Sequence, residues 1–166
     1  EMRSTGEVLG MANNFALAFY KSQEAANAKL PDDGAVLISL SEKPIAAGRA
    51  AREFADLGFK VFATEGTARF LEGFGVAAEV VRKIDEGRPN VLDYIVNGQL
   101  SIIINTPSPR RDALADDASI RKAALKAKVP YITTVAAAHA SALGIAAART
   151  DKGAVLSLQE YHAQIR

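Results

Sequence analysis

Residues 35–68 read AVLISLSEKPIAAGRAAREFADLGFKVFATEGTA, and this stretch decides the fold. It opens with an apolar run, residues 35–40, whose lack of polar alternation predicts a strand buried on both faces of a sheet. From Pro44 the apolar residues recur every three or four positions until Gly58 ends the expected helix. A second apolar run, residues 59–63, follows at once. A strand, a helix and another strand in this order predict a parallel βαβ unit.

The same alternation continues along most of the chain. Further apolar runs lie at residues 78–81, 100–104 and 131–133, and the stretches with helical spacing are residues 67–74, 91–96, 119–127 and 135–148. Five strands, each followed by a helix, predict an α/β fold: three αβα layers around a central five-stranded parallel sheet, as in Rossmann-like and flavodoxin-like domains. Outside this repeat, residues 13–28 predict one more helix, and residues 155–165 a further strand and a short helix.

The composition excludes several classes of function. With 166 residues, 49% of them hydrophobic, the chain can bury one core but not two. Twenty basic and nineteen acidic residues leave a net charge of +1, so no nucleic-acid or membrane partner is expected. There is no cysteine and there are only two histidines, which argues against a disulfide framework, a thiolate nucleophile or a metal site. No signal peptide or membrane-length apolar run is found, and a cytoplasmic location is expected.

Polar side chains gather where the expected strands end, which is where open parallel sheets bind ligands. After the second strand, residues 64–67 (TEGT) place two hydroxyls and a glycine at the start of a helix, an arrangement that can hold a phosphate. Other strand ends supply ammonium, amide and hydroxyl groups, from Lys43, Lys83, Asn105, Thr106, Ser108, Thr133 and Thr134. Their shared position predicts a ligand that carries a phosphate.

Each of these signals has a simpler explanation. Thr64 could only cap a helix, the lysines could be ordinary solvated charges, and Asn105 with Thr106 could begin a turn before Pro107. The glycine segment is also weaker than a Walker or dinucleotide motif, because it contains neither GxxxxGK nor GxGxxG. The prediction therefore depends on several strand ends together.

Four segments carry a resemblance to a known family. They read EMRSTGEVLG (residues 1–10), FATEGTARFLEGFGV (62–76), VRKIDEGRPNVLDYIVNGQLSIIINTPS (81–108, followed by an arginine pair) and SLQEYHAQIR (157–166). Together they resemble the allosteric, methylglyoxal synthase-like domain at the carboxyl end of carbamoyl phosphate synthetase large subunits. The resemblance implies that residues 13–166 form this domain and that residues 1–12 end the preceding ATP-grasp domain. The chain opens on Glu1 without a methionine, and we accordingly expect it to be a piece of a longer protein.

The resemblance implies regulation by this chain rather than catalysis. Members of the family bind UMP as an inhibitor, IMP as an activator, and ornithine at the junction with the preceding domain. The parent protein would be an ATP-dependent ligase, the glutamine-hydrolysing carbamoyl phosphate synthase of pyrimidine and arginine biosynthesis, which uses Mg²⁺ or Mn²⁺ and K⁺. Its partners would be the small glutaminase subunit and other copies of the large subunit. No cofactor is expected in this chain itself.

The resemblance also assigns residues. Those matching the family's nucleotide site are Lys43, Thr64, Thr67, Lys83, Asn105 and Thr106, and those matching its ornithine junction are Tyr131 and Thr133. Two departures stand out, because Pro107 replaces a second threonine and Ile132 replaces an acidic residue. The remaining ornithine ligands of the family are carboxylates of the preceding domain, so weak ornithine binding is expected here.

Two alternatives remain. A free-standing methylglyoxal synthase would need a carboxylate to remove a proton from dihydroxyacetone phosphate. The family places it in a GGDQ-like turn, where this chain reads DEGRPN at residues 85–90, with Asp85 and Glu86 as the available carboxylates. The second alternative is an oligomerisation module without a ligand, for which the alanine-rich residues 136–148 would supply a packing surface.

Overall fold

The computed structural model describes residues 7–107, 111–150 and 156–164. Its strands are β1 (Ala35–Leu40), β2 (Lys60–Ala63), β3 (Ala78–Val80), β4 (Ile102–Thr106) and β5 (Tyr131–Ile132). They form one sheet in the order β3-β2-β1-β4-β5, and every neighbouring pair is parallel. The predicted five-stranded parallel sheet is therefore confirmed. The strand order reverses direction between β1 and β4, and such a switch point is where open α/β sheets bind ligands.

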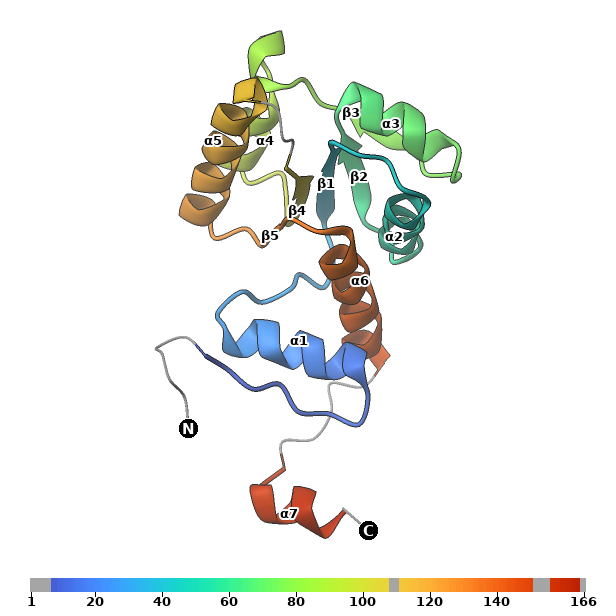
Figure 1. Cartoon of the computed structure of the whole chain (residues 1–166), viewed down its shortest axis with the longest axis vertical. Coiled ribbons are helices and arrows are strands. Elements are labelled where there is room, and N and C mark those ends of the chain that lie inside the picture. The colour runs from blue at the N-terminus through green and yellow to red at the C-terminus, as the bar shows by residue number, and fades with distance from the viewer. Residues whose placement is uncertain (1–6, 108–110, 151–155, 165–166) are drawn as a thin grey trace.

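Helices cover both faces of the sheet (Figure 1). They are α1 (Phe15–Ala25), α2 (Ile45–Asp56), α3 (Glu65–Glu72), the 3₁₀ turn η1 (Ile84–Glu86), α4 (Val91–Val96), α5 (Arg111–Ala127), α6 (Val135–Thr150) and α7 (Leu158–Ala163). In Figure 1, α4 and α5 lie on one side of the sheet and α2 and α3 on the other, while α6 extends away from the sheet to α1. None of the helices in the described ranges has the length and apolar character needed to cross a membrane.

Alternating strand residues build the core on each side of the sheet. In β4, Ile102 and Ile104 pack in the cluster that includes α2 and α6, while Ile103 packs with Ile120 of α5 on the opposite face. Ile102 and Ile103 are 0% exposed, which explains why the strand reads as a continuous apolar run. Each such side chain contributes about 1.5–3 kcal/mol relative to an exposed position.

Several boundaries differ from the sequence prediction, and three of them concern the polar strand ends. Helix α3 begins at Glu65 rather than at residue 67, because Thr64 is extended (φ −65°, ψ 152°) and forms the N-cap. Strand β4 extends to Thr106 and pairs with β1 as far as that residue. Helix α5 begins at Arg111 rather than at residue 119, since its first two turns are rich in alanine and aspartate and have little apolar periodicity.

The carboxyl-terminal helix is confirmed as α7. Ser157 caps it, because its hydroxyl oxygen accepts from the Glu160 backbone N–H at 3.2 Å while the Glu160 carboxylate accepts from the Ser157 N–H at 2.6 Å. The strand expected before it begins at residue 155, which lies outside the described residues, as does Ser108.

Candidate ligand site at the carboxyl edge of the sheet

Two threonine hydroxyls complete the hydrogen bonding at the end of β1. The N–H of Leu40 donates to Thr67 Oγ1 at 3.1 Å, and the N–H of Ser41 donates to Thr106 Oγ1 at 3.0 Å. Strand β2 pairs with β1 only as far as Ile38, so the Thr67 hydroxyl takes the place of the next strand residue. Both hydroxyls are thereby held next to the switch point of the sheet.

The start of α3 leaves hydrogen-bond donors without acceptors. Thr64 occupies the N-cap position but makes no capping bond, and its hydroxyl instead donates to Thr67 Oγ1 at 3.1 Å. The simple capping explanation for Thr64 is thus wrong. Within the described residues, the N–H groups of Glu65 and Gly66 have no backbone acceptor, and a Cβ placed on Gly66 would meet no atom within 4 Å. Open space beside free N–H groups at a helix start suits an anion.

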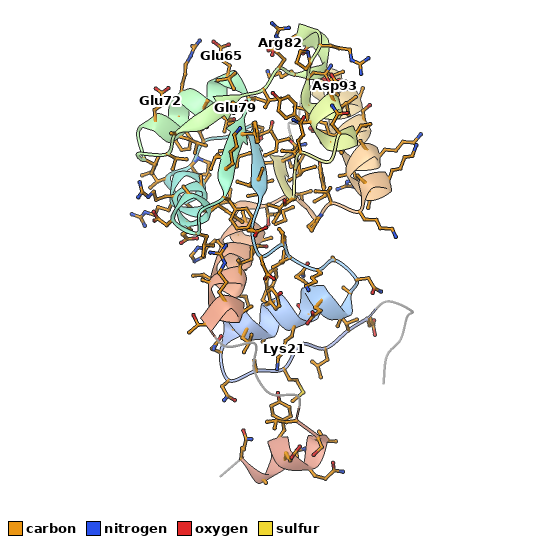
Figure 2. The ribbon with its side chains drawn as sticks, turned by 180° about the vertical axis from the view of Figure 1, so that it is seen from behind. Lys21, Glu65, Glu72, Glu79, Arg82 and Asp93 are labelled. Atoms are coloured by element: carbon orange, nitrogen blue, oxygen red, sulfur yellow. The ribbon has the colours of Figure 1, made fainter. Side chains whose placement is uncertain are left out.

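The two candidate lysines lie at the same edge of the sheet, and among the described residues neither makes a hydrogen bond to these threonines. Lys43 is in the loop between β1 and α2, and Lys83 follows β3; both are exposed. Within the described ranges, neither ammonium group is part of an ion pair. Figure 2 shows Glu65 and Arg82, the neighbours of Thr64 and Lys83, at one end of the molecule, far from Lys21 on α1.

Asn105 is the buried polar centre of the site. It lies in β4 with 3% of its surface exposed, and its Nδ2 donates at 2.8 Å both to Asp117 Oδ1 of α5 and to the Tyr131 hydroxyl of β5. The turn explanation for Asn105 is therefore wrong, because the residue is within a strand and its side chain bridges two other elements. Tyr131, which the resemblance assigns to a separate ornithine junction, is therefore hydrogen-bonded directly to Asn105.

The surroundings of Tyr131 change its titration. Burial raises the pKa of the Tyr131 hydroxyl above its ordinary value, and the charge of Asp117 adds to this. The hydrogen bond from Asn105 and the positive charge of Arg121 act in the opposite direction. The Arg121 guanidinium lies 5.6 Å from the centre of the Tyr131 ring. The phenol is therefore protonated at neutral pH.

Sequence reasoning missed Asp117 and Arg121. Both belong to α5, and Asp117 falls before the point where the predicted helix began. A signal was available, since an aspartate and an arginine four residues apart share one face of a helix. Starting the helix earlier would have placed this pair beside the end of β4.

The other described candidate residues are not joined to this group of threonines and Asn105. Thr133 is half-buried between β5 and α6, and no hydrogen bond joins it to the other described candidates. Glu86 Oε2 accepts from the backbone N–H of Lys83 at 2.8 Å, so this carboxylate is bound to the η1 turn, and Asp85 is exposed. Across the described ranges, no group of three histidine, aspartate or glutamate side chains could hold a metal ion.

Comparisons with known proteins agree with this architecture. The model of the MGS-like domain family matches residues 47–133. The chain is 46% identical to the carbamoyl phosphate synthase large chain of Methanothrix thermoacetophila over 100% of this chain and 16% of that protein. It is 47% identical to the large chain of Archaeoglobus fulgidus over 98% of this chain and 15% of that protein. It is also 43% identical to the large chain, C-terminal section, of Methanopyrus kandleri over 98% of this chain and 30% of that protein.

These comparisons confirm the resemblance seen in the four sequence segments. The chain spans less than a third of the length of each of these relatives. More than half of the chain lies inside the matched residues, and so do the ends of β2, β3, β4 and β5. The chain belongs to the MGS-like domain family.

Proposed function

We propose that this chain is the regulatory, nucleotide-binding domain of a carbamoyl phosphate synthase large chain. The similarity to large chains extends over the whole chain but over only a small part of each relative, as expected for one domain of a larger enzyme. In this proposal residues 13–166 are the MGS-like domain, and residues 1–12 end the ATP-grasp domain before it. The parent enzyme would make carbamoyl phosphate with ATP and a glutaminase subunit, at sites outside this chain.

The observation that supports a nucleotide site most strongly is the group of donors around the end of β1. The Thr67 hydroxyl, which Thr64 holds in place, and the free N–H groups at the start of α3 suit a phosphate, and hydrogen bonds to a charged group are the strong kind. Lys43 and Lys83 would add positive charge from neighbouring loops. Thr106 and Asn105, across the switch point, would contact the ribose. UMP and IMP share both of these parts.

Regulation would follow from linkage between this site and the rest of the enzyme. A nucleotide that binds one arrangement of the domains more tightly than another shifts their equilibrium, typically by about 1–3 kcal/mol of coupling. The start of α3 is the element that a bound phosphate would stabilise. Ornithine, in this proposal, acts at the domain junction near Tyr131 and Thr133.

Calorimetric titration tests the proposal directly. We expect the chain to bind UMP or IMP, with ornithine binding far weaker. Thr64→Ala and Lys83→Ala should each reduce nucleotide affinity about tenfold. Lys83→Ala removes a positive charge beside the phosphate, and Thr64→Ala removes the hydroxyl that donates to Thr67 Oγ1 and holds it in place. Lys29→Ala, which removes an exposed lysine from the loop after α1, is the matched control and should leave affinity unchanged. Absence of heat with both nucleotides and with inorganic phosphate would favour a ligand-free module instead.

Glu65 provides a second test of where the phosphate lies. This carboxylate stands at the first position of α3 and is paired with Arg69; their side chains are 61% and 72% exposed. Glu65→Gln is expected to raise phosphate affinity about twofold at low ionic strength, because it removes a nearby negative charge, and the gain should fade in high salt. Glu72→Gln, at the other end of α3, is the control. A lower affinity for Glu65→Gln would contradict this placement.

A further inference from the structure

We propose that Asp117 and Tyr131 are positioning residues of the ligand site, which fix the side-chain amide of Asn105 so that it can only accept a hydrogen bond from the ligand. This inference rests on the proposed nucleotide site. It adds that the site selects ligands that carry a hydrogen-bond donor near the phosphate. It also gives Tyr131 a role beside the nucleotide.

The partners of Asn105 determine which way its amide faces. A carboxylate oxygen accepts hydrogen bonds and cannot donate them, so the Asn105 atom that lies 2.8 Å from Asp117 Oδ1 must be Nδ2. The second N–H of the same nitrogen is used by the Tyr131 hydroxyl, also at 2.8 Å. An asparagine amide has two N–H donors, and both are therefore occupied within the protein. Rotating the amide by 180° would place its oxygen against Asp117 Oδ1 and break that bond, and the Tyr131 hydroxyl would have to donate instead of accept.

The carbonyl oxygen of Asn105 remains for a ligand. No donor among the described residues bonds to this Oδ1 atom. In the same part of the chain, no side-chain oxygen or nitrogen that is sealed from solvent lacks a partner. The Oδ1 atom must therefore reach the surface, although Asn105 as a whole is 3% exposed. An oriented acceptor in a buried residue favours a partner that brings a donor.

This acceptor is within reach of a molecule whose phosphate lies at the start of α3. Neighbouring strands are about 4.8 Å apart, so the ends of β2 and β4 are about 10 Å apart, which one nucleotide can span. The ligand must then carry a hydrogen-bond donor near its phosphate. In a nucleoside monophosphate, whatever its base, the ribose hydroxyls provide one. The site should accordingly distinguish ribonucleotides from deoxynucleotides, and a phosphate oxygen, which only accepts, should not bind at Asn105.

The test compares UMP with its 2′-deoxy and 3′-deoxy analogues and with inorganic phosphate, by calorimetry on the whole chain. The wild type should bind UMP about tenfold more tightly than one of the two analogues. Tyr131→Phe keeps the ring and removes only the hydroxyl, so the amide of Asn105 loses one of its two hydrogen bonds within the protein. We expect this variant to reduce the preference to about threefold or less, while the affinity for inorganic phosphate stays the same.

Tyr94→Phe is the matched control. Tyr94 also packs beside the α4–α5 face, with its ring 5.1 Å from that of Phe62, but its hydroxyl makes no hydrogen bond to the described residues. If Tyr131→Phe keeps the full preference for UMP, or if Tyr94→Phe reduces it equally, the positioning role is overturned.

A measurement without ligand separates this inference from the proposed function. The side-chain amide protons of Asn105 should exchange slowly with solvent in the wild type and faster in Tyr131→Phe, as observed by NMR. Fast exchange in the wild type would overturn the positioning role even if nucleotides bind. Slow exchange together with no binding of UMP, IMP or phosphate would support the fixed amide and overturn the nucleotide site.

Discussion

Thr67→Val is expected to lower the free energy of unfolding by about 1–3 kcal/mol and to weaken phosphate binding about a hundredfold. Valine has the shape of threonine but no oxygen. The variant therefore leaves the N–H of Leu40, a residue that is 7% exposed, without the acceptor that Thr67 Oγ1 provides at 3.1 Å. A buried donor that loses its partner costs its full desolvation energy. Urea unfolding measures the first effect and calorimetry with UMP and phosphate measures the second.

The loss of binding follows from the order of the hydrogen bonds. Thr67 Oγ1 accepts from the Leu40 N–H and from the Thr64 hydroxyl, so its own proton remains free to donate. Thr67 thus offers a donor to a phosphate while it is held in place by the sheet. Removing the oxygen deletes this donor and also releases Thr64, whose hydroxyl then has no fixed direction.

Thr67→Ser separates chemistry from packing. Serine keeps the hydroxyl and loses one methyl group, so we expect binding within about threefold of the wild type and a small loss of stability. If Thr67→Val binds phosphate as well as Thr67→Ser does, the hydroxyl has only a structural role. If Thr67→Val unfolds at the same urea concentration as the wild type, the Leu40 N–H must have found another acceptor.

The sheet was predictable from the sequence because its strands are buried on both faces. The runs that became β1 and β4 have few polar residues, and local pattern is enough to identify them. The positions of the strand ends could be predicted from these runs, and Thr64, Thr67 and Asn105 were identified as candidates because they lie at strand ends. Which strands are neighbours did not follow from local pattern, since the order of the sheet depends on packing between distant segments.

The hydrogen bonds of Asn105 with Asp117 and Tyr131 could not be predicted from the sequence, because they too depend on packing between distant segments. Asp117 is 12 residues from Asn105 and Tyr131 is 26 residues away, and the three meet only because β4 lies between β1 and β5 with α5 packed across them. The aspartate lies in a helical turn without an apolar stripe, so periodicity did not identify it as part of a helix. The resemblance to a known family did identify Tyr131, but as part of the ornithine junction rather than as a partner of Asn105.

Asn105→Asp is expected to lower the free energy of unfolding by about 3–5 kcal/mol at pH 7.5. The change replaces the buried Nδ2 donor, 2.8 Å from Asp117 Oδ1, by an oxygen of nearly the same size. Two carboxylates would then face each other, one at a position that is 3% exposed and the other half-buried, so water would screen their charges only weakly. Urea unfolding of the variant and the wild type measures the difference.

The stability lost in Asn105→Asp should increase as the pH rises. Two carboxyls that share a buried site raise the pKa of the pair in the folded state above the value of about 3.9 in the unfolded chain. Between these two values the folded variant binds more protons than the unfolded one, so its stability falls as the pH rises through the raised pKa. The deficit relative to the wild type should therefore be largest at pH 7.5 and shrink at pH 5.

Exchanging the amide and the carboxylate between positions 105 and 117 tests whether the pairing of these two side chains causes the loss of stability. Asn105→Asp combined with Asp117→Asn again places one amide opposite one carboxylate, and the Tyr131 hydroxyl can donate where it previously accepted. We expect the double variant to recover more than half of the lost stability and to lose the pH dependence, although Asp117 has further contacts that the exchange does not restore. A double variant less stable than Asn105→Asp alone would show that the hydrogen bond between positions 105 and 117 is not what stabilises this end of the sheet.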